Sequence, residues 1–318
     1  MFRVGITDCD HVSLMEEEAV FQANDVEYDL FQCKTEKELI DNMKPYEVIA
    51  LQYAPLTRRV MEQLPNLRCV VRYGVGVDSI DVKGAKELGI AVCNVPDYGV
   101  QEVASHALAL MFQLCRKTDV ACREVKQGVW KYENHIPILR FSVMTVGVVG
   151  LGRIGRCFAD MVHALGCRVL AYDPIYANKK DQLPVYAKFV DLDSLLQQSD
   201  VVSLHVPMED ARDLLGEREL RLMKSSAYLI NVSRGGIVNE TALERALREN
   251  WICAAGFDVM AKEPPMPNHP LLHLDNFYCT PHMAWYSEQA AKDMKRKVAE
   301  EMVRALRDEP LHNQLNPF

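Results

Sequence analysis

The stretch Val146-Gly147-Val148-Val149-Gly150-Leu151-Gly152-Arg153-Ile154-Gly155 decides the fold of this chain. An apolar run typical of a buried strand leads directly into three glycines spaced Gly-x-Gly-x-x-Gly, and a helix pattern follows. The glycines permit a tight turn, close approach of the backbone to a pyrophosphate, and close packing of a helix whose N-terminus faces the anion. We predict a dinucleotide site here, formed by Gly150, Gly152, Arg153, Ile154 and Gly155.

An acidic residue follows the second strand of this predicted unit. Asp173 ends an apolar run at the spacing of about twenty residues where a carboxylate accepts a ribose hydroxyl and repels the extra phosphate of NADP. The sequence therefore predicts NAD in preference to NADP. The alternative role for Asp173 is to begin an Asp-Pro turn with Pro174, and one residue can fill both roles.

Two later strand ends complete the predicted cofactor site. His205, Val206 and Pro207 follow an apolar run and are expected to wall the adenosine side, although a histidine at a strand end is as often a turn residue. Val232, which ends a later run, is expected to line the same site.

Composition indicates a globular protein with small partners. A length of 318 residues suits two domains, and 49% hydrophobic with 25% charged residues excludes disordered and fibrous classes. The net charge is −8, and no Lys/Arg block is longer than the three residues Lys295-Arg296-Lys297. We therefore expect neither nucleic acid nor an anionic membrane as a partner.

The cysteines and the N-terminus indicate the compartment. None of the ten cysteines forms a Cys-x-x-Cys pair, and several lie in apolar strand patterns, so neither a metal site nor a disulfide framework is expected. The first residues lack the apolar core of a signal peptide, and no apolar run approaches 18 residues. We expect a cytoplasmic protein.

Two series of alternating strand and helix patterns predict an α/β fold. In the first series, strands are predicted at residues 4–6, 48–51, 69–72 and 90–93, and helices at 36–43 and 82–88. In the second, strands are predicted at residues 145–149, 168–172, 201–206, 228–232, 253–257 and 277–279, and helices at 154–165 and 240–249. A largely buried helix over residues 103–115 lies between the series, and Ser287 caps a last helix that continues to residue 306.

Three residues with complementary chemistry each follow a predicted strand of the second series. These are Arg234 in Ser-Arg-Gly-Gly, Glu263 in Lys-Glu-Pro and His282 in Thr-Pro-His. They should gather at the carboxyl edge of the sheet, where such sheets bind ligands. An arginine can bind a carboxylate and polarise a carbonyl, and a histidine can give or take the alcohol proton. The alternative for Arg234 is a surface arginine after a strand.

Glu263 is the expected partner of His282. An ion pair between them favours imidazolium, so the histidine would donate a proton during reduction of a keto acid and accept one in reverse. His106 and His163 fall inside helix patterns and are interpreted as packing or surface residues. No constellation is recognised around His269, His273 or His312.

These motifs, in this order, resemble the D-isomer-specific 2-hydroxyacid dehydrogenases, a family that includes phosphoglycerate, glycerate and formate dehydrogenases. Tyr73-Gly74-Val75-Gly76-Val77-Asp78 and Gly256-Phe257-Asp258-Val259 extend the resemblance over nearly the whole chain. It implies that Arg234 binds the substrate carboxylate and carbonyl, that His282 is the acid/base and that Glu263 tunes it. Asp258 would contact the nicotinamide carboxamide, the amides of Val75 and Gly76 would help to hold the carboxylate, and Arg234 and His282 would also border the cofactor.

The resemblance also implies an architecture. A flavodoxin-like substrate domain, residues 1–98 plus 287–318, would wrap a central Rossmann NAD domain, residues 99–286, with the active site in the cleft. Family members are commonly homodimers through the NAD domain, and residues 127–138 (QGVWKYENHIPI) are expected to form part of that contact.

Departures from the family pattern narrow the substrate. Gln52-Tyr53-Ala54-Pro55 stands where phosphoglycerate dehydrogenases carry an arginine and a serine, so a cation for a phosphate is missing and an unphosphorylated substrate is expected. Formate dehydrogenases replace the carboxylate partner of the histidine with an amide. Because Glu263 is present here, a formate dehydrogenase is not expected.

The stretch Met283-Ala284-Trp285-Tyr286-Ser287-Glu288-Gln289-Ala290 looks like the C-terminal-binding protein branch of the family, as do Ala50-Leu51-Gln52-Tyr53 and Val71-Arg72-Tyr73-Gly74. That likeness places Arg72 on the substrate carboxylate and Trp285 beside the side chain of the keto acid, with Tyr53 near the same pocket. Packing at a helix start for Trp285 and an ion pair at a strand end for Arg72 are the alternatives.

Two classes of function remain after these observations. The first is an NAD-dependent oxidoreductase that interconverts a small 2-keto acid and its D-2-hydroxy acid. The second is an NAD(H)-sensing scaffold, as the C-terminal-binding proteins are in corepression, in which the cofactor controls assembly. The chain ends at Phe318 without a long disordered tail, which favours the enzyme.

Overall fold

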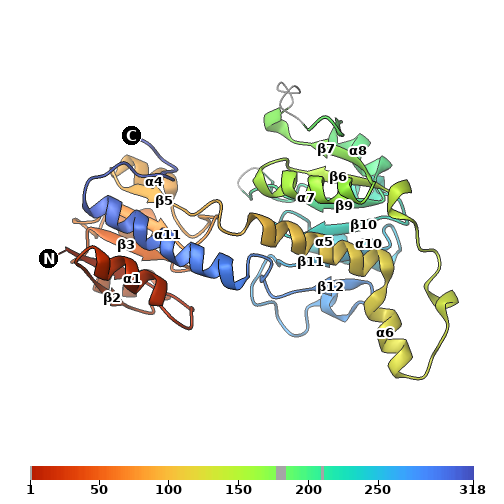
Figure 1. The fold of residues 1–318 in the computed structure, drawn as a ribbon, viewed down its shortest axis with the longest axis horizontal. Coiled ribbons are helices and arrows are strands. Elements are labelled where there is room, and N and C mark those ends of the chain that lie inside the picture. Colours follow the sequence, from red (N-terminus) through yellow and green to blue (C-terminus); the bar gives the residue numbers. More distant parts are fainter. Residues whose placement is uncertain (1, 177–183, 209–210) are drawn as a thin grey trace. The chain divides into compact units, whose positions relative to one another are not determined.

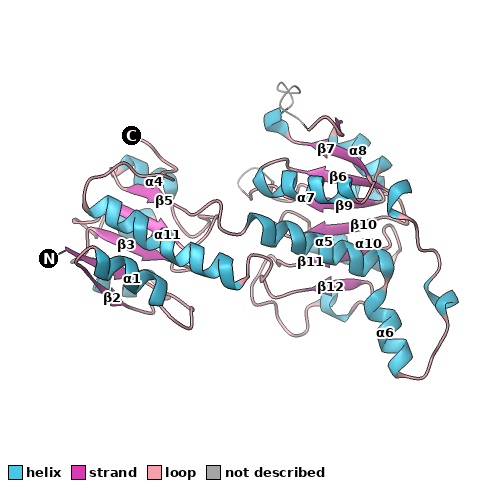
Figure 2. Ribbon diagram, viewed as in Figure 1, coloured by secondary structure: helices cyan, strands magenta, loops and turns pink. Residues whose placement is uncertain are grey.

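The computed structural model describes residues 2–176, 184–208 and 211–318. Contacts among them divide the chain into two compact units, Met1–Gly99 with Ser287–Phe318, and Val100–Tyr286. The first unit is therefore built from both ends of the chain and the second from its middle (Figure 1). Each unit contains one sheet flanked by helices (Figure 2).

The first unit is a parallel sheet with the strand order β2-β1-β3-β4-β5, which is the order of flavodoxin-like folds. Its strands are β1 (Phe2–Ile6), β2 (Val26–Leu30), β3 (Val48–Leu51), β4 (Cys69–Arg72) and β5 (Ala91–Cys93). Its helices are α1 (Met15–Ala23), α2 (Glu36–Met43), α3 (Arg58–Met61), α4 (Val82–Glu87) and α11 (Glu288–Leu306).

Helix α11 returns the C-terminal end of the chain to this first sheet. Ser287 is its N-cap and accepts a hydrogen bond from the Ala290 N–H, as predicted from the sequence. The helix packs on α1, β3 and β4, and its buried face includes Met294, Val298 and Met302. An apolar face that repeats at helical spacing therefore joins residues distant in sequence into one core.

The second unit is a parallel sheet with the strand order β12-β11-β10-β9-β6-β7-β8. Its strands are β6 (Thr145–Val149), β7 (Arg168–Tyr172), β8 (Ala187–Phe189), β9 (Val201–Leu204), β10 (Tyr228–Asn231), β11 (Ala254–Phe257) and β12 (Phe277–Cys279). Its helices are α5 (Val100–Arg116), α6 (Thr118–Lys126), α7 (Arg153–Ala164), α8 (Leu192–Gln198), α9 (Glu217–Leu222) and α10 (Glu240–Arg248). The order turns back at β6, which pairs with both β7 and β9, so a ligand crevice is expected at the carboxyl ends of these strands.

Helix α5 covers one face of the second sheet. It packs against α7, β10 and β11 through Ala104, Ala107, Leu110, Met111 and Leu114. The helix predicted over residues 103–115 is therefore present and extends from Val100 to Arg116. Its position brings its first turns toward the ends of β11 and β12, which matters for the site below.

The α/β class and the Rossmann order of the second sheet confirm the fold prediction. The elements that the sequence pattern missed are mostly short or polar, such as β2 (VEYDL) at a sheet edge and α6, which buries no side chain. Edge strands alternate with polar residues, and exposed helices lack an apolar face, so neither produces a strong periodic signal. The strand predicted over residues 201–206 ends at Leu204, because His205 and Val206 already belong to the following turn.

Candidate active site

The glycine turn after β6 needs its glycines for two different reasons. Gly150 has φ of +90°, and a Cβ added there would meet the backbone carbonyl of His205 at 2.6 Å. A Cβ at Gly155 would overlap the carbonyl oxygen of Gly150. A Cβ at Gly152 would have no described protein atom within 4 Å. The protein itself thus requires the first and third glycines, whereas the second leaves space beside the backbone that a ligand can approach.

Helix α7 begins at this turn without a side-chain cap. Gly152 is its N-cap and offers no side chain to the first N–H groups, which are those that anions bind at a helix N-terminus. Arg153, the first helical residue, is exposed beside them. Uncapped amides and open space at Gly152 fit the pyrophosphate of a dinucleotide.

Asp173 is buried at the end of β7 and bonds the backbone on both sides of the turn. Its Oδ2 accepts the Leu151 N–H at 2.7 Å, and its Oδ1 accepts the Ile175 N–H at 2.9 Å. The carboxylate therefore ties the glycine turn to the chain after β7. The turn-forming role that the sequence left open is present, and the ribose contact stays a prediction.

His205 packs against the glycine turn, with its backbone carbonyl next to Gly150. Its Nε2 is 2.9 Å from Ser203 Oγ, and its ring packs on Phe158 with 5.1 Å between centroids. Burial lowers the pKa of His205 to about 3, so the imidazole is neutral at physiological pH. Of its neighbours, Val206 is half-buried and Pro207 is exposed, whereas Val232 is buried.

The turn after β10 holds Arg234 by bonds from the strand itself. Asn231 donates from Nδ2 to the Arg234 carbonyl at 2.8 Å and accepts the Ser233 N–H at 3.0 Å. Ser233 donates from Oγ to the carbonyl of Leu204 on the neighbouring strand at 2.6 Å. A Cβ at Gly235 would overlap the backbone of Met260, so the glycine after the arginine is needed for close packing. The guanidinium is therefore carried on a rigid turn.

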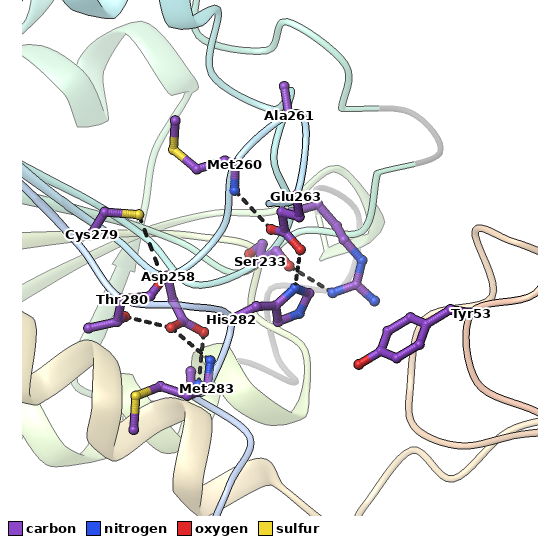
Figure 3. Close-up of polar contacts among 12 residues, drawn as sticks. Tyr53, Ser233, Asp258, Met260, Ala261, Glu263, Cys279, Thr280, His282 and Met283 are labelled. Carbon is purple, nitrogen blue, oxygen red and sulfur yellow. Dashed lines mark hydrogen bonds and ion pairs between the residues drawn. The ribbon is translucent and has the colours of Figure 1, made fainter. Parts of the chain in front are cut away.

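His282 and Glu263 form a direct pair, as predicted. His282 Nδ1 lies 2.6 Å from Glu263 Oε2, and Glu263 Oε1 accepts the Met260 N–H at 2.9 Å (Figure 3). Burial raises the pKa of Glu263, but the bond to His282, the Met260 N–H and the charge of Arg234 outweigh it and leave the pKa below its usual value. Glu263 is thus ionised, and because it occupies Nδ1, the Nε2 atom of His282 faces away from it.

The backbone of His282 is held in a conformation that side chains rarely adopt. Its φ is +52°, and its N–H donates to the carbonyl of Asp258 at 2.9 Å. The Asp258 carboxylate accepts the N–H groups of Met283 at 3.0 Å and Ala284 at 2.8 Å, and the hydroxyl of Thr280 at 2.5 Å (Figure 3). One buried aspartate therefore fixes the backbone on both sides of His282 and aims its ring.

Reasoning from sequence did not predict this role of Asp258. The resemblance placed its carboxylate on the nicotinamide, whereas in the structure the carboxylate is 1% exposed and bonds three protein groups. Two histidines interpreted as lacking a site also have partners: His106 Nε2 lies 2.9 Å from Thr280 Oγ1, and His269 Nε2 lies 3.2 Å from Glu240 Oε2. No sequence signal marks these pairs, because the partners come from different elements.

The first unit contains the predicted substrate residues Arg72, Val75, Gly76 and Tyr53, whereas Trp285 lies at the end of the second unit. Arg72 ends β4, and its Nη1 lies beside Gly74, whose φ of +121° favours glycine. Tyr53 is 61% exposed after β3, and Val75 is 39% exposed beside Gly76.

Buried Asp8 holds the loop that carries Tyr53. Its carboxylate accepts the N–H groups of Gln52 at 3.2 Å, Tyr53 at 2.6 Å and Ala54 at 3.2 Å. Three successive amides directed at one carboxylate fix the shape of the loop. The sequence analysis did not identify Asp8.

The described residues contain neither a metal-binding cluster nor a membrane-spanning helix. Across residues 2–176, 184–208 and 211–318, no cluster of three or more His, Cys, Asp or Glu side chains is arranged to hold a metal ion. Within those ranges, no helix has both the length and the apolar character needed to cross a membrane.

Comparison with known proteins identifies the family. Residues 108–284 match the NAD-binding domain of the D-isomer specific 2-hydroxyacid dehydrogenases. The chain is also 39% identical over 287 residues to a glyoxylate reductase of Korarchaeum cryptofilum, covering 89% of this chain and 86% of that protein. The chain belongs to the D-isomer specific 2-hydroxyacid dehydrogenase family. The predictions of family, oxidoreductase class and NAD as cofactor are thereby confirmed.

Other relatives in this dehydrogenase family differ in length and in the activity for which they are named. A D-3-phosphoglycerate dehydrogenase of Archaeoglobus fulgidus is 37% identical over 306 residues, which cover 95% of this chain and 58% of that protein. This chain therefore spans little more than half of that relative. A D-lactate dehydrogenase from Aquifex aeolicus, solved with NAD and lactic acid, superposes with a TM-score of 0.90 at 26% identity over 99% of both chains. These relatives do not single out the C-terminal-binding protein branch, which stays a prediction.

Proposed function

We propose that this dehydrogenase interconverts a small, unphosphorylated 2-keto acid and its D-2-hydroxy acid. The observation that carries the proposal is the contact of 2.6 Å between His282 Nδ1 and Glu263 Oε2, on the sheet whose first strand ends in the glycine turn. A histidine held by an ionised carboxylate at one ring nitrogen has its other nitrogen available for proton transfer. Bound NADH supplies the hydride.

Each residue of the predicted catalytic set has a separate task in this proposal. Arg234 binds the carboxylate of the substrate and polarises the carbonyl that is reduced. His282 donates a proton from Nε2 to the carbonyl oxygen, and takes it back when the alcohol is oxidised. Glu263 holds the histidine in position through the contact at Nδ1.

The glycine turn and the residues around it hold the cofactor. We assign the pyrophosphate to the uncapped amides at Gly152, Arg153 and Ile154, where an added Cβ at Gly152 meets open space. Asp173 is assigned to the ribose, which favours NAD over NADP. His205, Val206, Pro207, Val232 and Asp258 are proposed as its further neighbours.

Residues of the first unit, together with Trp285 of the second unit, are assigned to the substrate because of the family resemblance. We propose that Arg72 and the amides of Val75 and Gly76 bind the carboxylate, and that Tyr53 and Trp285 contact the side chain of the keto acid. Trp285 packs edge-on against Tyr286, with ring centroids 5.5 Å apart, which limits its rotation. We therefore propose that Met1–Gly99 with Ser287–Phe318 acts as the substrate domain.

The test is NADH oxidation by the purified protein with a panel of 2-keto acids. The panel runs from glyoxylate and hydroxypyruvate through thioether and aromatic side chains to one phosphorylated member, and each is repeated with NADPH. We expect turnover with an unphosphorylated class and a preference for NADH. Tight NADH binding with negligible turnover on every member would contradict the proposal and favour an NAD(H)-sensing scaffold.

We further propose a homodimer formed through the segment that follows α5. Helix α6 buries no side chain, and it projects from the second sheet before the following chain returns to that sheet (Figure 1). Trp130 is 86% exposed and Tyr132 and Ile136 are also exposed, so a set of large apolar side chains lies uncovered in one segment. A second copy of the chain is the partner that covers them, as the family resemblance implies.

Sedimentation velocity tests this assembly. The wild-type protein should sediment at twice the mass of the chain, and the double variant Trp130→Ser, Ile136→Asp should sediment at the mass of one chain. A wild-type monomer at micromolar concentration would refute the dimer. We also expect a cytoplasmic location, because all ten cysteines are free and most are buried, which suits a reducing compartment.

A further inference from the structure

A histidine outside the predicted catalytic set reaches the backbone that carries His282. His106 lies on α5, and its Nε2 is 2.9 Å from Thr280 Oγ1 at the end of β12. Its side chain is only 19% exposed, and the same Nε2 lies 3.7 Å from Asp258 Oδ1. The contact links a helix to a loop 174 residues away along the chain.

The direction of each hydrogen bond follows from the chemistry of the acceptors. An ionised carboxylate only accepts, so in the contact of 2.5 Å between Thr280 Oγ1 and Asp258 Oδ1 the hydroxyl donates. That hydroxyl has a single proton, so toward His106 its oxygen must accept. His106 therefore donates from Nε2, and its proton is on that nitrogen. A chain of two bonds with a defined direction runs from His106 through Thr280 to Asp258.

Asp258 is the residue on which this chain converges and the residue that sets the backbone around His282. Its carboxylate accepts the N–H groups of Met283 and Ala284, and its own carbonyl accepts the His282 N–H. The φ of +52° at His282 persists only because these bonds oppose relaxation of the loop. Rotation of Thr280 away from Asp258 would leave its Oδ1 with the Met283 N–H alone among these donors.

We propose that His106 is a positioning residue for the proton transfer: it orients the Thr280 hydroxyl onto Asp258 and so keeps His282 aimed at the substrate carbonyl. The inference rests on the proposed function of His282. His106 does not contact the reacting atoms in this account, and it acts through two bonds. It anchors the catalytic loop to α5, the helix that packs on β10 and β11.

The test compares two substitutions at one position. His106→Leu keeps a similar volume but removes the donor, whereas His106→Gln keeps an N–H near the position of Nε2. We expect His106→Leu to lower kcat about tenfold, because a small misplacement of an acid reduces its effectiveness, while the Kd for NADH changes less than twofold. His106→Gln should recover kcat to within about twofold of wild type. His163→Leu is the control, since His163 stacks on Tyr186 elsewhere in the second unit.

Hydrogen exchange gives a readout that does not depend on turnover. The amides of Met283 and Ala284 are held by Asp258, so their exchange should accelerate about tenfold in His106→Leu and stay near wild type in His106→Gln. Unchanged exchange in His106→Leu, or equal losses of kcat in both variants, would overturn the proposal. A wild-type protein without turnover would refute the proposed function instead, and the exchange experiment would still decide the role of His106.

A double-mutant cycle separates this chain of bonds from general destabilisation. Thr280→Val removes the hydroxyl that His106 orients. If both residues act through the same bond, adding His106→Leu to Thr280→Val should lower kcat by less than twofold beyond Thr280→Val alone. Multiplicative losses would show that His106 acts independently of Thr280 and would contradict the proposal.

Discussion

In each unit of this dehydrogenase, a buried aspartate that follows a strand accepts successive backbone amides of a loop and the hydroxyl of a threonine. In the first unit, Asp8 follows β1, is 7% exposed and accepts three successive amides from Gln52 to Ala54. In the second unit, Asp258 follows β11 directly and accepts two successive amides, those of Met283 and Ala284. Each also accepts a threonine hydroxyl at 2.5 Å, from Thr7 and Thr280 respectively.

The two aspartates differ in what they hold beyond the amides. The hydroxyl that Asp8 accepts comes from Thr7, its neighbour in sequence. The threonine at Asp258 is 22 residues away and connects to His106 on α5, and the Asp258 carbonyl also holds His282. Asp8 therefore shapes a loop, whereas Asp258 aims one side chain.

The substitution Asp258→Asn should have the largest effect on activity. The amide keeps the size of the carboxylate but replaces one acceptor with an NH₂, which opposes either the Ala284 N–H at Oδ2 or the Met283 N–H and Thr280 hydroxyl at Oδ1. We expect kcat to fall about 100-fold, because misplacement of an acid of about 1 Å has an effect of this order. Steady-state kinetics check the result, with the surface variant Asp193→Asn as control. A kcat within twofold of wild type would show that Asp258 does not aim His282.

Asp8→Asn tests the corresponding aspartate of the first unit. The NH₂ of the asparagine would oppose either the Gln52 amide or the amides of Tyr53 and Ala54, so it should loosen the loop of Tyr53 and raise KM for the keto acid about tenfold, with a smaller effect on kcat. Binding of NADH, measured by fluorescence titration, should change less than twofold. If NADH affinity fell while KM stayed constant, the Asp8 loop would not belong to the substrate side.

The smallest expected effect concerns the thiols beside the two aspartates. Burial raises the pKa of Cys9 to about 11, with the charge of Glu17 adding to it against the His11 amide, and burial with the charge of Asp258 raises the pKa of Cys279 to about 11. Both thiols should react slowly with iodoacetamide at pH 7.5 and about tenfold faster for each unit of pH up to that value. Mass spectrometry follows the labelling. Rapid labelling of either thiol at neutral pH would contradict the raised pKa values.

The sequence predicted the parts of the site that follow from strand order. Arg234, Glu263 and His282 each follow a strand of one parallel sheet, so their meeting at its carboxyl edge could be inferred from spacing alone. The Gly-x-Gly-x-x-Gly turn was predicted because its glycine spacing is a local sequence signature. Both depend on short segments whose geometry the chain determines locally.

The residues that the sequence did not predict act across elements. His106 appears as one histidine in an apolar helix pattern, and nothing near it in sequence indicates that Thr280 is its partner. Asp8 likewise belongs to no motif, because its partners follow β3. Contacts of this kind depend on packing between distant elements and on side-chain direction, which periodicity does not encode.

The central claim is that His282 transfers the proton, and His282→Ala tests it most directly. With the preferred 2-keto acid and saturating NADH, we predict a kcat lower by about 10²- to 10⁴-fold, with the Kd for NADH within twofold of wild type. That result would separate chemistry from cofactor binding. Near-normal turnover by His282→Ala would contradict the mechanism, and the acid would then have to be sought elsewhere on the sheet edge.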